Sequence, residues 1–506
     1  MKGDLIRFAF DITDALSSKK EEHLIAIRVD SVGIYTDYNN KIVPPTGDFF
    51  NYGGIYRDLY IEICPNAHVV RADIRPTEFI IKDHKTGSVE VEIDVTIKNY
   101  VPENEDDSYE KDHQISVAFH RLVFENSSEI RDKKSWRYIN ATGHPIVEGS
   151  TSEILKADEE EKIHREPTCY NARQFSLTLN DVDLWSTKDP NLYLLEVNLT
   201  HEGKTDRFYT QTGFREFSIE GKEILLNGHS LFLAGNSYHE EYPGMGRALT
   251  EERRFKDLEL IKYNLSSNFL RSHYPLHPYT YLLTDRMGIA VWEENPVYWF
   301  NDIKFIYAEI RNSTYAMLIE MIFRDYNRPS ILFWGAANEP FAISMLDPYL
   351  TNARELQEEL DPNRVLAYAS HSSHLSSSET SHNLLEIAAP NTYWGTFEGE
   401  FGEFYEGTKY AIEIHTQNYP DMPIISMEFG VWRSGDEELQ VKCFEETTEA
   451  LLECKNVVGF THWIAFDYYG NDYRNSMGAF NIERNYAAPV AEVMRENYYN
   501  ITKNNL

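Results

Sequence analysis

The chain has 506 residues, and its 81 acidic and 48 basic side chains give a formal net charge of −33. This balance excludes proteins that bind nucleic acid or anionic membranes, because no surplus of Lys and Arg is present to neutralise phosphates. Four scattered cysteines without a Cys-x-x-Cys pair exclude a disulfide framework and a zinc ribbon. No uninterrupted apolar run is long enough for a transmembrane helix. We therefore expect a soluble, cytoplasmic protein of more than one domain.

The first 217 residues predict β-structure throughout. Residues 1–65 contain strand-like runs such as 24–29, but this is too little chain for a complete β-sandwich. Residues 66–217 are long enough for a sandwich, and Val89–Ile97 alternates apolar and polar residues. Such alternation is typical of a half-buried antiparallel strand. We expect a partial β-domain over 1–65, followed by a β-sandwich over 66–217.

The hydrophobic period becomes helical in the second half of the chain. Thr250 is a typical N-cap, and Phe255, Leu258 and Ile261 then share one helical face. Strand-like runs alternate with helix-length segments from here onward, which predicts parallel βα units. Residues 218–506 have the length of one elaborated (β/α)8 TIM barrel.

Two glutamates stand at the ends of short apolar runs. Ile331–Trp334 leads through small residues to Glu339, and Pro423–Met427 leads to Glu428. At roughly 30 residues per barrel unit, the two glutamates lie about three units apart, each at the carboxyl end of a buried parallel strand. Their side chains would then project into one cavity. A facing pair of carboxylates is what glycoside hydrolysis requires, one as proton donor and the other as nucleophile or base.

The alternative is that both acids are buried and salt-bridged for structure only. We favour the catalytic interpretation because acidic side chains are rarely buried without a function. In that interpretation, desolvation favours the protonated form of one glutamate, which suits a general acid. The other glutamate needs hydrogen-bond donors or positive charge to stay ionised. The sequence leaves open which glutamate has which surroundings.

Further candidates lie at other predicted strand ends, where they either contact a sugar or pack in the core: His239, His273, Tyr393 and Trp463. An aromatic face at such a position can stack on a pyranose ring. His273 and His277 have the spacing of a helical zinc pair, but Pro275 lies between them and disfavours a helix. No metal site is therefore predicted.

Several short motifs together resemble glycoside hydrolase family two, the family of β-galactosidases and β-glucuronidases. They keep the family's order over nearly the whole chain, which makes the resemblance specific. The motifs are Asp48–Arg57, Thr212–Arg215, Leu226–Gly228, Asn236–Pro243, Ser272–Pro275, Asn338–Pro340 and Glu428–Gly430. The resemblance implies a partial sugar-binding jelly-roll domain over 1–65, an immunoglobulin-like β-sandwich over 66–217 and a catalytic TIM barrel over 218–506.

The family precedent implies a retaining exo-β-glycosidase that works by double displacement and needs no cofactor. Glu339 is then the acid/base, Glu428 the nucleophile, and Asn338 the partner of the sugar 2-hydroxyl. The remaining residues expected to contact a small carbohydrate substrate are Asp48, His239, His273, Tyr393, Trp463 and Asn475.

Two departures from the family pattern bear on substrate and metal. Members that bind a uronic acid carry an Asn-x-Lys motif in a late barrel loop, where this chain has Asn475-Ser476-Met477. Loss of the lysine favours a neutral sugar, a β-galactoside first. A β-glucuronide is the alternative, with the adjacent Arg474 as the cation. The magnesium-binding histidine of the large β-galactosidases has no counterpart after Glu294, so no metal is implied.

The resemblance also implies a departure at the start of the chain, where we expect the first half of the family's jelly-roll domain to be absent. A start codon placed too late, a split enzyme or a decayed form would each account for this. The last of these supports a rival function, that of a non-catalytic carbohydrate-binding remnant. Unpaired strand edges within 1–65 favour self-association, so we expect a homo-oligomer or a marginally stable chain.

Overall fold

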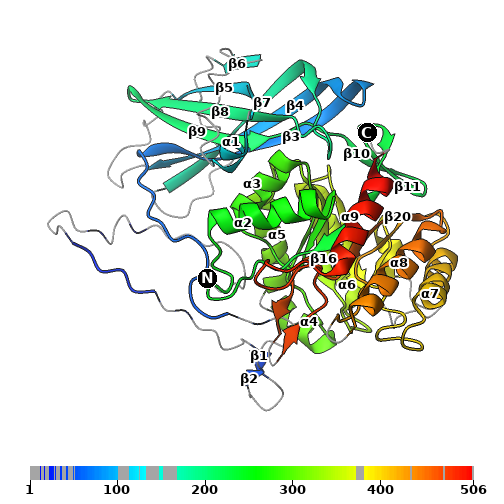
Figure 1. Cartoon of the computed structure of the whole chain (residues 1–506). Coiled ribbons are helices and arrows are strands. Elements are labelled where there is room, and N and C mark those ends of the chain that lie inside the picture. Colours follow the sequence, from blue (N-terminus) through cyan, green and yellow to red (C-terminus); the bar gives the residue numbers. More distant parts are fainter. Residues whose placement is uncertain are drawn as a thin grey trace.

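The computed structural model describes residues 12, 16, 22–27, 29, 35–36, 42–43, 50, 52–100, 113–124, 126–132, 147–151, 168–310, 312–371, 381–433, 436–470 and 473–503. A β-sandwich lies beside a parallel barrel (Figure 1), which confirms the predicted multidomain architecture. In the N-terminal part, β1 (Tyr35–Thr36) pairs with β2 (Ile42–Val43). The partial jelly-roll predicted over 1–65 falls largely outside the described residues, so it stays a prediction.

Two antiparallel sheets form the sandwich, with strand orders β3-β4-β7 and β6-β5-β8-β9. Their bounds are β3 (Ala67–Asp83), β4 (Thr86–Tyr100), β5 (Gln114–Leu122), β6 (Val147–Thr151), β7 (Thr168–Asp183), β8 (Leu192–His201) and β9 (Lys204–Thr212), with α1 (Ser127–Arg131) after β5. Val89, Val91, Ile93, Val95 and Ile97 all lie in the core between the sheets. The alternation read from the sequence is therefore confirmed as a strand with one buried face.

Eight parallel strands form the barrel in the order β18-β17-β16-β15-β14-β13-β20-β19. They are β13 (Leu233–Ser237), β14 (Phe269–Ser272), β15 (Ala290–Glu294), β16 (Ile331–Asn338), β17 (Val365–Ser370), β18 (Ala389–Pro390), β19 (Ile424–Ser426) and β20 (Val457–His462). A parallel bridge between Ala388 and Ile424 joins β18 to β19 and closes the ring. Every residue of β16 is buried, because its side chains alternate between the barrel interior and the surrounding helices. This explains the continuous apolar run at Ile331–Trp334.

Helices surround the barrel (Figure 1). They are α2 (Glu251–Glu259), α3 (Pro278–Met287), α4 (Asp302–Ile310), α5 (Ser313–Asp325), α6 (Leu346–Leu360), α7 (Phe404–Asn418), α8 (Glu437–Leu452) and α9 (Pro489–Thr502), with the π-turn η4 (Leu260–Asn264) and the 3-10 turn η6 (Ser381–Leu384). The Thr250 hydroxyl accepts a hydrogen bond from the Arg253 N–H at 3.2 Å. Phe255, Leu258 and Ile261 are buried. The predicted cap and apolar face of this helix are both confirmed.

Apolar side chains fill the amino-terminal end of the barrel interior. A small antiparallel sheet precedes β13: β10 (Phe217–Glu220), β11 (Glu223–Leu226) and β12 (His229–Ser230). The Phe217 ring lies 5.2 Å from that of Phe333 inside the barrel. Arg215, buried at the junction with the sandwich, donates to the carbonyls of Pro329 at 3.1 Å and Ile331 at 2.8 Å. These contacts fix the sandwich to the barrel at that end.

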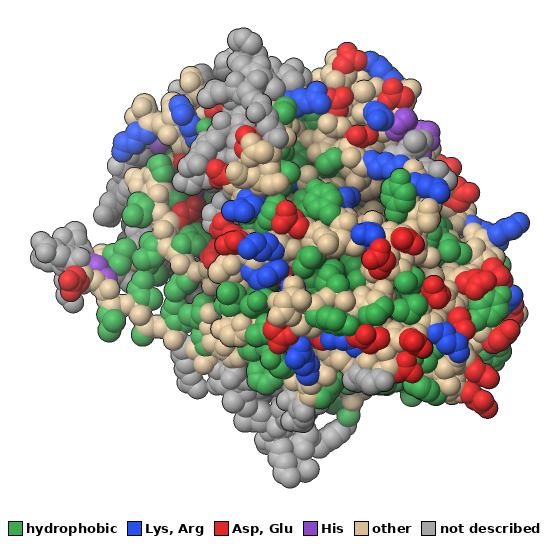
Figure 2. Space-filling model, in the orientation of Figure 1, with side chains coloured by type: hydrophobic (Ala, Val, Ile, Leu, Met, Phe, Trp, Pro, Cys, Tyr) green, Lys and Arg blue, Asp and Glu red, His purple; other side chains and the backbone are tan. Residues whose placement is uncertain are grey.

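The surface carries charges of both signs. Figure 2 shows Lys and Arg side chains interspersed with Asp and Glu on the visible face. On this face, the formal net charge of −33 is therefore not gathered into one acidic patch. Within the part of the chain that the structure describes, no helix is long and apolar enough to cross a membrane.

Candidate active site

The carboxyl ends of the barrel strands carry most of the residues that the sequence predicted for the site. Asn338 ends β16 and Glu339 follows it, Glu428 follows β19, His239 follows β13, His273 follows β14, Tyr393 follows β18 and Trp463 follows β20. Asn475 lies in β22 (Arg474–Asn475), which pairs with β21 (Tyr468–Tyr469). Asp48 lies outside the described residues. Closure of the barrel brings these strand ends to one rim.

Glu428 lies in a positively charged, hydrogen-bonding environment. One of its carboxylate oxygens accepts a hydrogen bond from the guanidinium of Arg271, a side chain with no exposed surface. The same oxygen is 3.3 Å from His273 Nε2. The other oxygen accepts from the Tyr393 hydroxyl at 2.9 Å. Each oxygen of this carboxylate therefore faces a donor.

The electrostatic consequence is an ionised Glu428. Burial by itself raises the pKa of this carboxyl, but the Arg271 charge and the His273 hydrogen bond outweigh burial and lower the pKa to about 2. For His273, burial and the Arg271 charge lower the pKa, whereas hydrogen bonds to Glu294 and Glu428 raise it to about 9. At neutral pH, an imidazolium and a guanidinium thus flank the Glu428 carboxylate.

Glu339 has different surroundings. Asn391 donates from Nδ2 to Glu339 Oε1 at 2.7 Å, and the Trp299 indole donates from Nε1 to Oε2 at 2.7 Å. Both of these partners are neutral. Glu339 also has a φ of +46°, a left-handed conformation that few non-glycine residues adopt. Its backbone N–H is held by the Ala369 carbonyl at 2.8 Å, which fixes the direction of the side chain.

A chain of hydrogen bonds joins the two glutamates. Arg271 donates from Nη2 to Asn338 Oδ1 at 2.7 Å, and Asn391 Nδ2 lies 3.4 Å from the same oxygen. Asn391 is also bridged to Glu428 through the backbone. The question that the sequence left open is answered here, since the buried cation Arg271 lies beside Glu428, whereas Glu339 receives hydrogen bonds from an amide and an indole.

Aromatic rings line one side of this cluster. The rings of His239 and Trp463 are 5.3 Å apart, and those of His273 and Trp463 are 4.9 Å apart. Tyr468 packs 4.7 Å from His239, and its hydroxyl accepts from Asn475 Nδ2 at 3.1 Å. Asn475 is therefore linked to the aromatic cluster through Tyr468.

Two family models match the chain over most of its length. The model described as "Glycosyl hydrolases family 2" matches residues 68–215, and "Glycosyl hydrolases family 2, TIM barrel domain" matches residues 217–440. The chain belongs to glycoside hydrolase family 2. The resemblance read from the short motifs is thereby confirmed.

Relatives within family 2 carry two different activity names. A β-galactosidase of Thermoanaerobacterium thermosulfurigenes is 26% identical, over 72% of this chain and 44% of its own length. A β-glucuronidase of Streptococcus agalactiae is 24% identical, over 85% of this chain and 67% of its own length. This chain thus spans less than half of the first relative. The FMN-binding β-glucuronidase from Facaelibacterium prausnitzii shares the fold, with a TM-score of 0.71 at 23% identity over 90% of this chain and 67% of that one.

Four residues of this family 2 site were not assigned to it from the sequence: Arg271, Glu294, Trp299 and Asn391. A signal existed for two of them. Glu294 is the last residue of an apolar strand, Glu339 directly follows one, and Arg271 directly precedes the Ser272–Pro275 motif. Trp299 follows irregular backbone, where no periodicity shows the direction of a side chain. Asn391 follows β18, which has only two residues and therefore too little periodicity to show that direction.

Glu294 organises the charged residues behind Glu428. Its oxygens accept from Arg271 Nη2 at 3.0 Å, from His273 Nδ1 at 2.9 Å and from Trp292 Nε1 at 3.0 Å. Gly335 permits this arrangement, because a Cβ there would lie 2.3 Å from Trp292 Nε1. Among the described residues, no group of three or more His, Cys, Asp or Glu is arranged to hold a metal ion. The hydrogen bonds of Glu294 go instead to Arg271, His273 and Trp292.

The residues compared above with the Asn-x-Lys motif, Met477 and Arg474, both make contacts within the chain. Met477 is only 1% exposed and belongs to the barrel core. The Arg474 guanidinium forms an ion pair with Glu483 at 2.9 Å and lies 3.8 Å from Asp467. The partly exposed Arg474 cation is therefore paired with Glu483, and Asp467 lies nearby.

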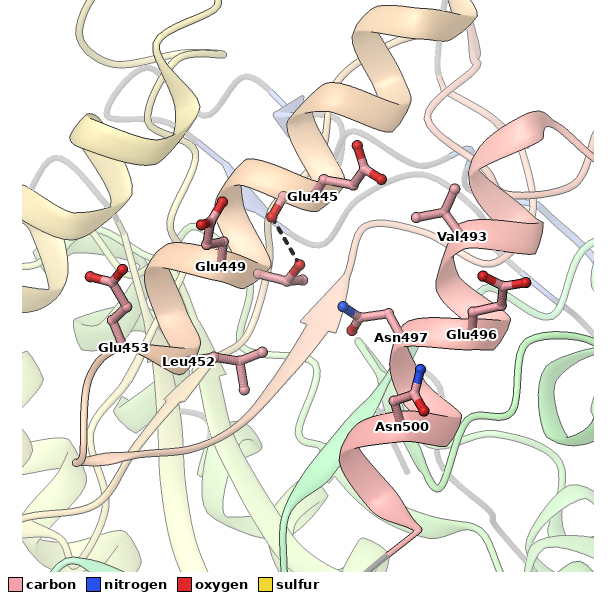
Figure 3. A pocket seen from close by; sticks show the side chains of 9 residues that line it. Glu445, Glu449, Leu452, Glu453, Val493, Glu496, Asn497 and Asn500 are labelled. Carbon is pink, nitrogen blue, oxygen red and sulfur yellow. Dashed lines mark hydrogen bonds between the residues drawn. The ribbon is translucent and has the colours of Figure 1, made fainter.

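A separate hollow of about 720 Å³ lies on the outside of the barrel, between α8 and α9 (Figure 3). Its lining includes the carboxylates of Glu445, Glu449, Glu453 and Glu496. The hollow is formed by helices of the outer ring, whereas Glu339 and Glu428 lie at the carboxyl ends of the strands. It therefore takes no part in the site described above.

Proposed function

We propose that this family 2 protein is a retaining β-glycosidase that removes a terminal β-linked hexose. One observation carries the proposal: the Glu428 carboxyl is kept ionised by Arg271 and His273, with its pKa lowered to about 2, whereas Glu339 is held by the neutral donors Asn391 and Trp299. An ionised carboxylate suits a nucleophile. The other carboxyl of the pair, Glu339, which accepts hydrogen bonds from an amide and an indole, is then the proton donor that the reaction requires.

Glu428 and Glu339 act in two balanced steps in this proposal. The Glu428 carboxylate attacks the anomeric carbon, the bond from that carbon to the glycosidic oxygen breaks, and the oxygen keeps the electron pair and takes a proton from Glu339. Glu339 then accepts a proton from water as the water oxygen attacks the anomeric carbon, and the Glu428 carboxylate leaves. Two inversions at one carbon retain the β-configuration.

Neighbouring side chains support these steps. Arg271 and Tyr393 hold both oxygens of Glu428, so that one of them faces the sugar in a fixed orientation. Asn338, which accepts a hydrogen bond from Arg271, is the proposed partner of the sugar 2-hydroxyl. The rings of His239 and Trp463 supply the apolar surface against which a pyranose stacks.

The first expected sugar is a neutral one, galactose. Met477, which the resemblance aligns with the uronate-binding lysine, is buried in the core, and Arg474 is paired with Glu483. A uronate carboxylate buried without a cation would cost several kcal/mol. A β-glucuronide is the second candidate, because the relative from Streptococcus agalactiae is named a β-glucuronidase.

The first experiment compares kcat/KM of the wild type for 4-nitrophenyl β-D-galactoside and for 4-nitrophenyl β-D-glucuronide. The second experiment adds azide to the variants E339A and E428A with a dinitrophenyl glycoside as substrate and identifies the product. We expect a higher kcat/KM for the galactoside. We also expect E339A to be rescued by azide with formation of the β-glycosyl azide, because its nucleophile is intact. E428A leaves a space in which azide attacks from the other face and gives the α-product.

Each contrary result has a distinct meaning. Faster turnover of the glucuronide would show that the preferred substrate is a β-glucuronide, the second candidate. A β-glycosyl azide from E428A reverses the two roles. A folded wild-type protein that binds galactose but hydrolyses neither glycoside is the non-catalytic remnant.

A further inference from the structure

The loop after β15 is tied to the segment that follows Glu339. Backbone hydrogen bonds run from the Asn338 N–H to the Val297 carbonyl at 2.9 Å and from the Trp299 N–H to the Asn338 carbonyl at 3.0 Å. The Phe341 N–H donates to the Phe300 carbonyl at 2.7 Å. Positions 297–300 and 338–341 thus form one rigid unit at the rim of the barrel.

Trp299, like Glu339, has a backbone conformation that is strained for its residue type. Its φ is +50°, which is an outlier for a bulky side chain. Such strain persists only where the surrounding structure holds it, and it is common at functional sites. The conformation directs the indole N–H onto Glu339 Oε2 at 2.7 Å. Lys304 donates from Nζ to the Trp299 carbonyl at 3.1 Å, which further fixes the residue.

The same unit carries apolar side chains that are partly exposed. The Phe341 ring centroid is 6.2 Å from that of Trp299 and 5.2 Å from that of His371, and Phe341 is 44% exposed. Two residues further, Ile343 is 95% exposed. The segment is nonetheless anchored, because Asp302 accepts from the backbone N–H groups of Ile343 at 3.2 Å, Ser344 at 2.9 Å and Met345 at 2.9 Å. An exposed apolar surface on a fixed scaffold is typical of a binding site.

We infer that Trp299 and Phe341 form the leaving-group site and that it receives a planar aromatic aglycone. The inference rests on the proposed function, since the group that departs must lie beside its proton donor, Glu339. Trp299 contacts that donor directly, and Phe341 extends the apolar surface outward. The site favours an aryl group over a second sugar, because the backbone N–H groups of this segment are used internally and hydrocarbon faces the solvent.

The experiment uses the full chain and one glycone, the one that the wild type turns over, with three leaving groups: 2-naphthyl, methyl and fluoride. F341A removes the ring, and F341L keeps an apolar side chain without an aromatic face. W299F keeps a ring but removes the N–H donor to Glu339. Y499A is the control, because Tyr499 is 63% exposed on α9, on the outside of the barrel.

We expect F341A to lower the ratio of kcat/KM for the naphthyl glycoside over the methyl glycoside by about fivefold, the size of an aromatic contact. F341L falls between F341A and the wild type. W299F moves the high-pH limb of kcat/KM to higher pH with both glycosides, because the lost donor no longer favours the ionised Glu339. The fluoride needs no proton from Glu339, so its limb stays in place. Y499A changes none of these values.

Four results would overturn the inference. In the first, F341A lowers kcat/KM for the naphthyl glycoside and for the methyl glycoside by the same factor. In the second, the wild type prefers a disaccharide with the same glycone to the naphthyl glycoside. In the third, W299F leaves the high-pH limb of the methyl glycoside unmoved. In the fourth, the folded wild type hydrolyses none of the glycosyl fluorides tried. This result would refute the proposed function as well.

Discussion

Replacement of Arg271 by methionine tests the central electrostatic argument. Arg271 has no exposed surface, and its guanidinium contacts Glu428, Glu294 and Asn338 at once. Methionine is of similar length and carries no charge. The variant R271M therefore removes the cation and its hydrogen bonds while it leaves most of the volume filled.

The size of the effect follows from the pKa of Glu428. Burial raises this pKa, yet Arg271 and His273 bring it from 4.5 to about 2. That difference corresponds to about 3 kcal/mol of folding stability at neutral pH. Because the pKa is depressed, this stability is present above about pH 4.5 and is lost as the pH falls through about 2. In R271M burial remains without its main opposing charge, so the loss begins at a higher pH.

Two measurements follow from this. In the pH profile of kcat/KM for an aryl glycoside, the acid limb of R271M moves upward by about two pH units or more, because the nucleophile is protonated at higher pH. In denaturant unfolding at pH 7, R271M loses about 3–5 kcal/mol, the usual cost of breaking a buried ion pair. The double variant R271M/E428Q loses less than the sum of its single variants, because no unpaired carboxylate remains at position 428.

A second buried ion pair supplies the control. Arg364 pairs with Asp361 at 2.6 Å directly before β17, at the end of the barrel opposite the site. R364M should be destabilised by a similar amount and keep the wild-type acid limb. An acid limb of R271M that stays in place, or additive effects of R271M and E428Q on stability, would refute the role of Arg271 in keeping Glu428 ionised.

Two further predictions concern the groups around Glu428. Y393F removes the hydroxyl that lies 2.9 Å from Glu428 Oε2. We expect kcat to fall by about 10- to 100-fold, because hydrogen bonds to charged groups are worth about 1.5–3 kcal/mol. The circular dichroism spectrum should be unchanged, and a loss of kcat below twofold would contradict the prediction. His273 has a pKa raised to about 9, so its contribution to stability is complete below about pH 6.5 and is lost as the pH rises through about 9. The free energy of unfolding of the wild type should therefore fall more steeply over this range than that of H273Q, and equal slopes would count against an imidazolium at this position.

The sequence by itself determined the architecture and where the candidate site is expected within it. The alternation at Val89–Ile97 predicts a strand with one buried face, and the capped segment after Thr250 predicts a helix with one buried face. The apolar runs before Glu339 and Glu428 predict buried parallel strands that end in carboxylates. These features depend on local periodicity and on the neighbours in the chain, so a single sequence carries them.

Only the tertiary structure decided how the two glutamates differ. Arg271 and Glu428 are separated by 157 positions in the chain, and only closure of the barrel brings their side chains together. No local pattern shows that the strand-end cation pairs with Glu428, or that Glu339 receives its hydrogen bonds from Asn391 and Trp299. The sequence places a side chain at a strand end, but its protonation depends on charges and burial supplied by other strands.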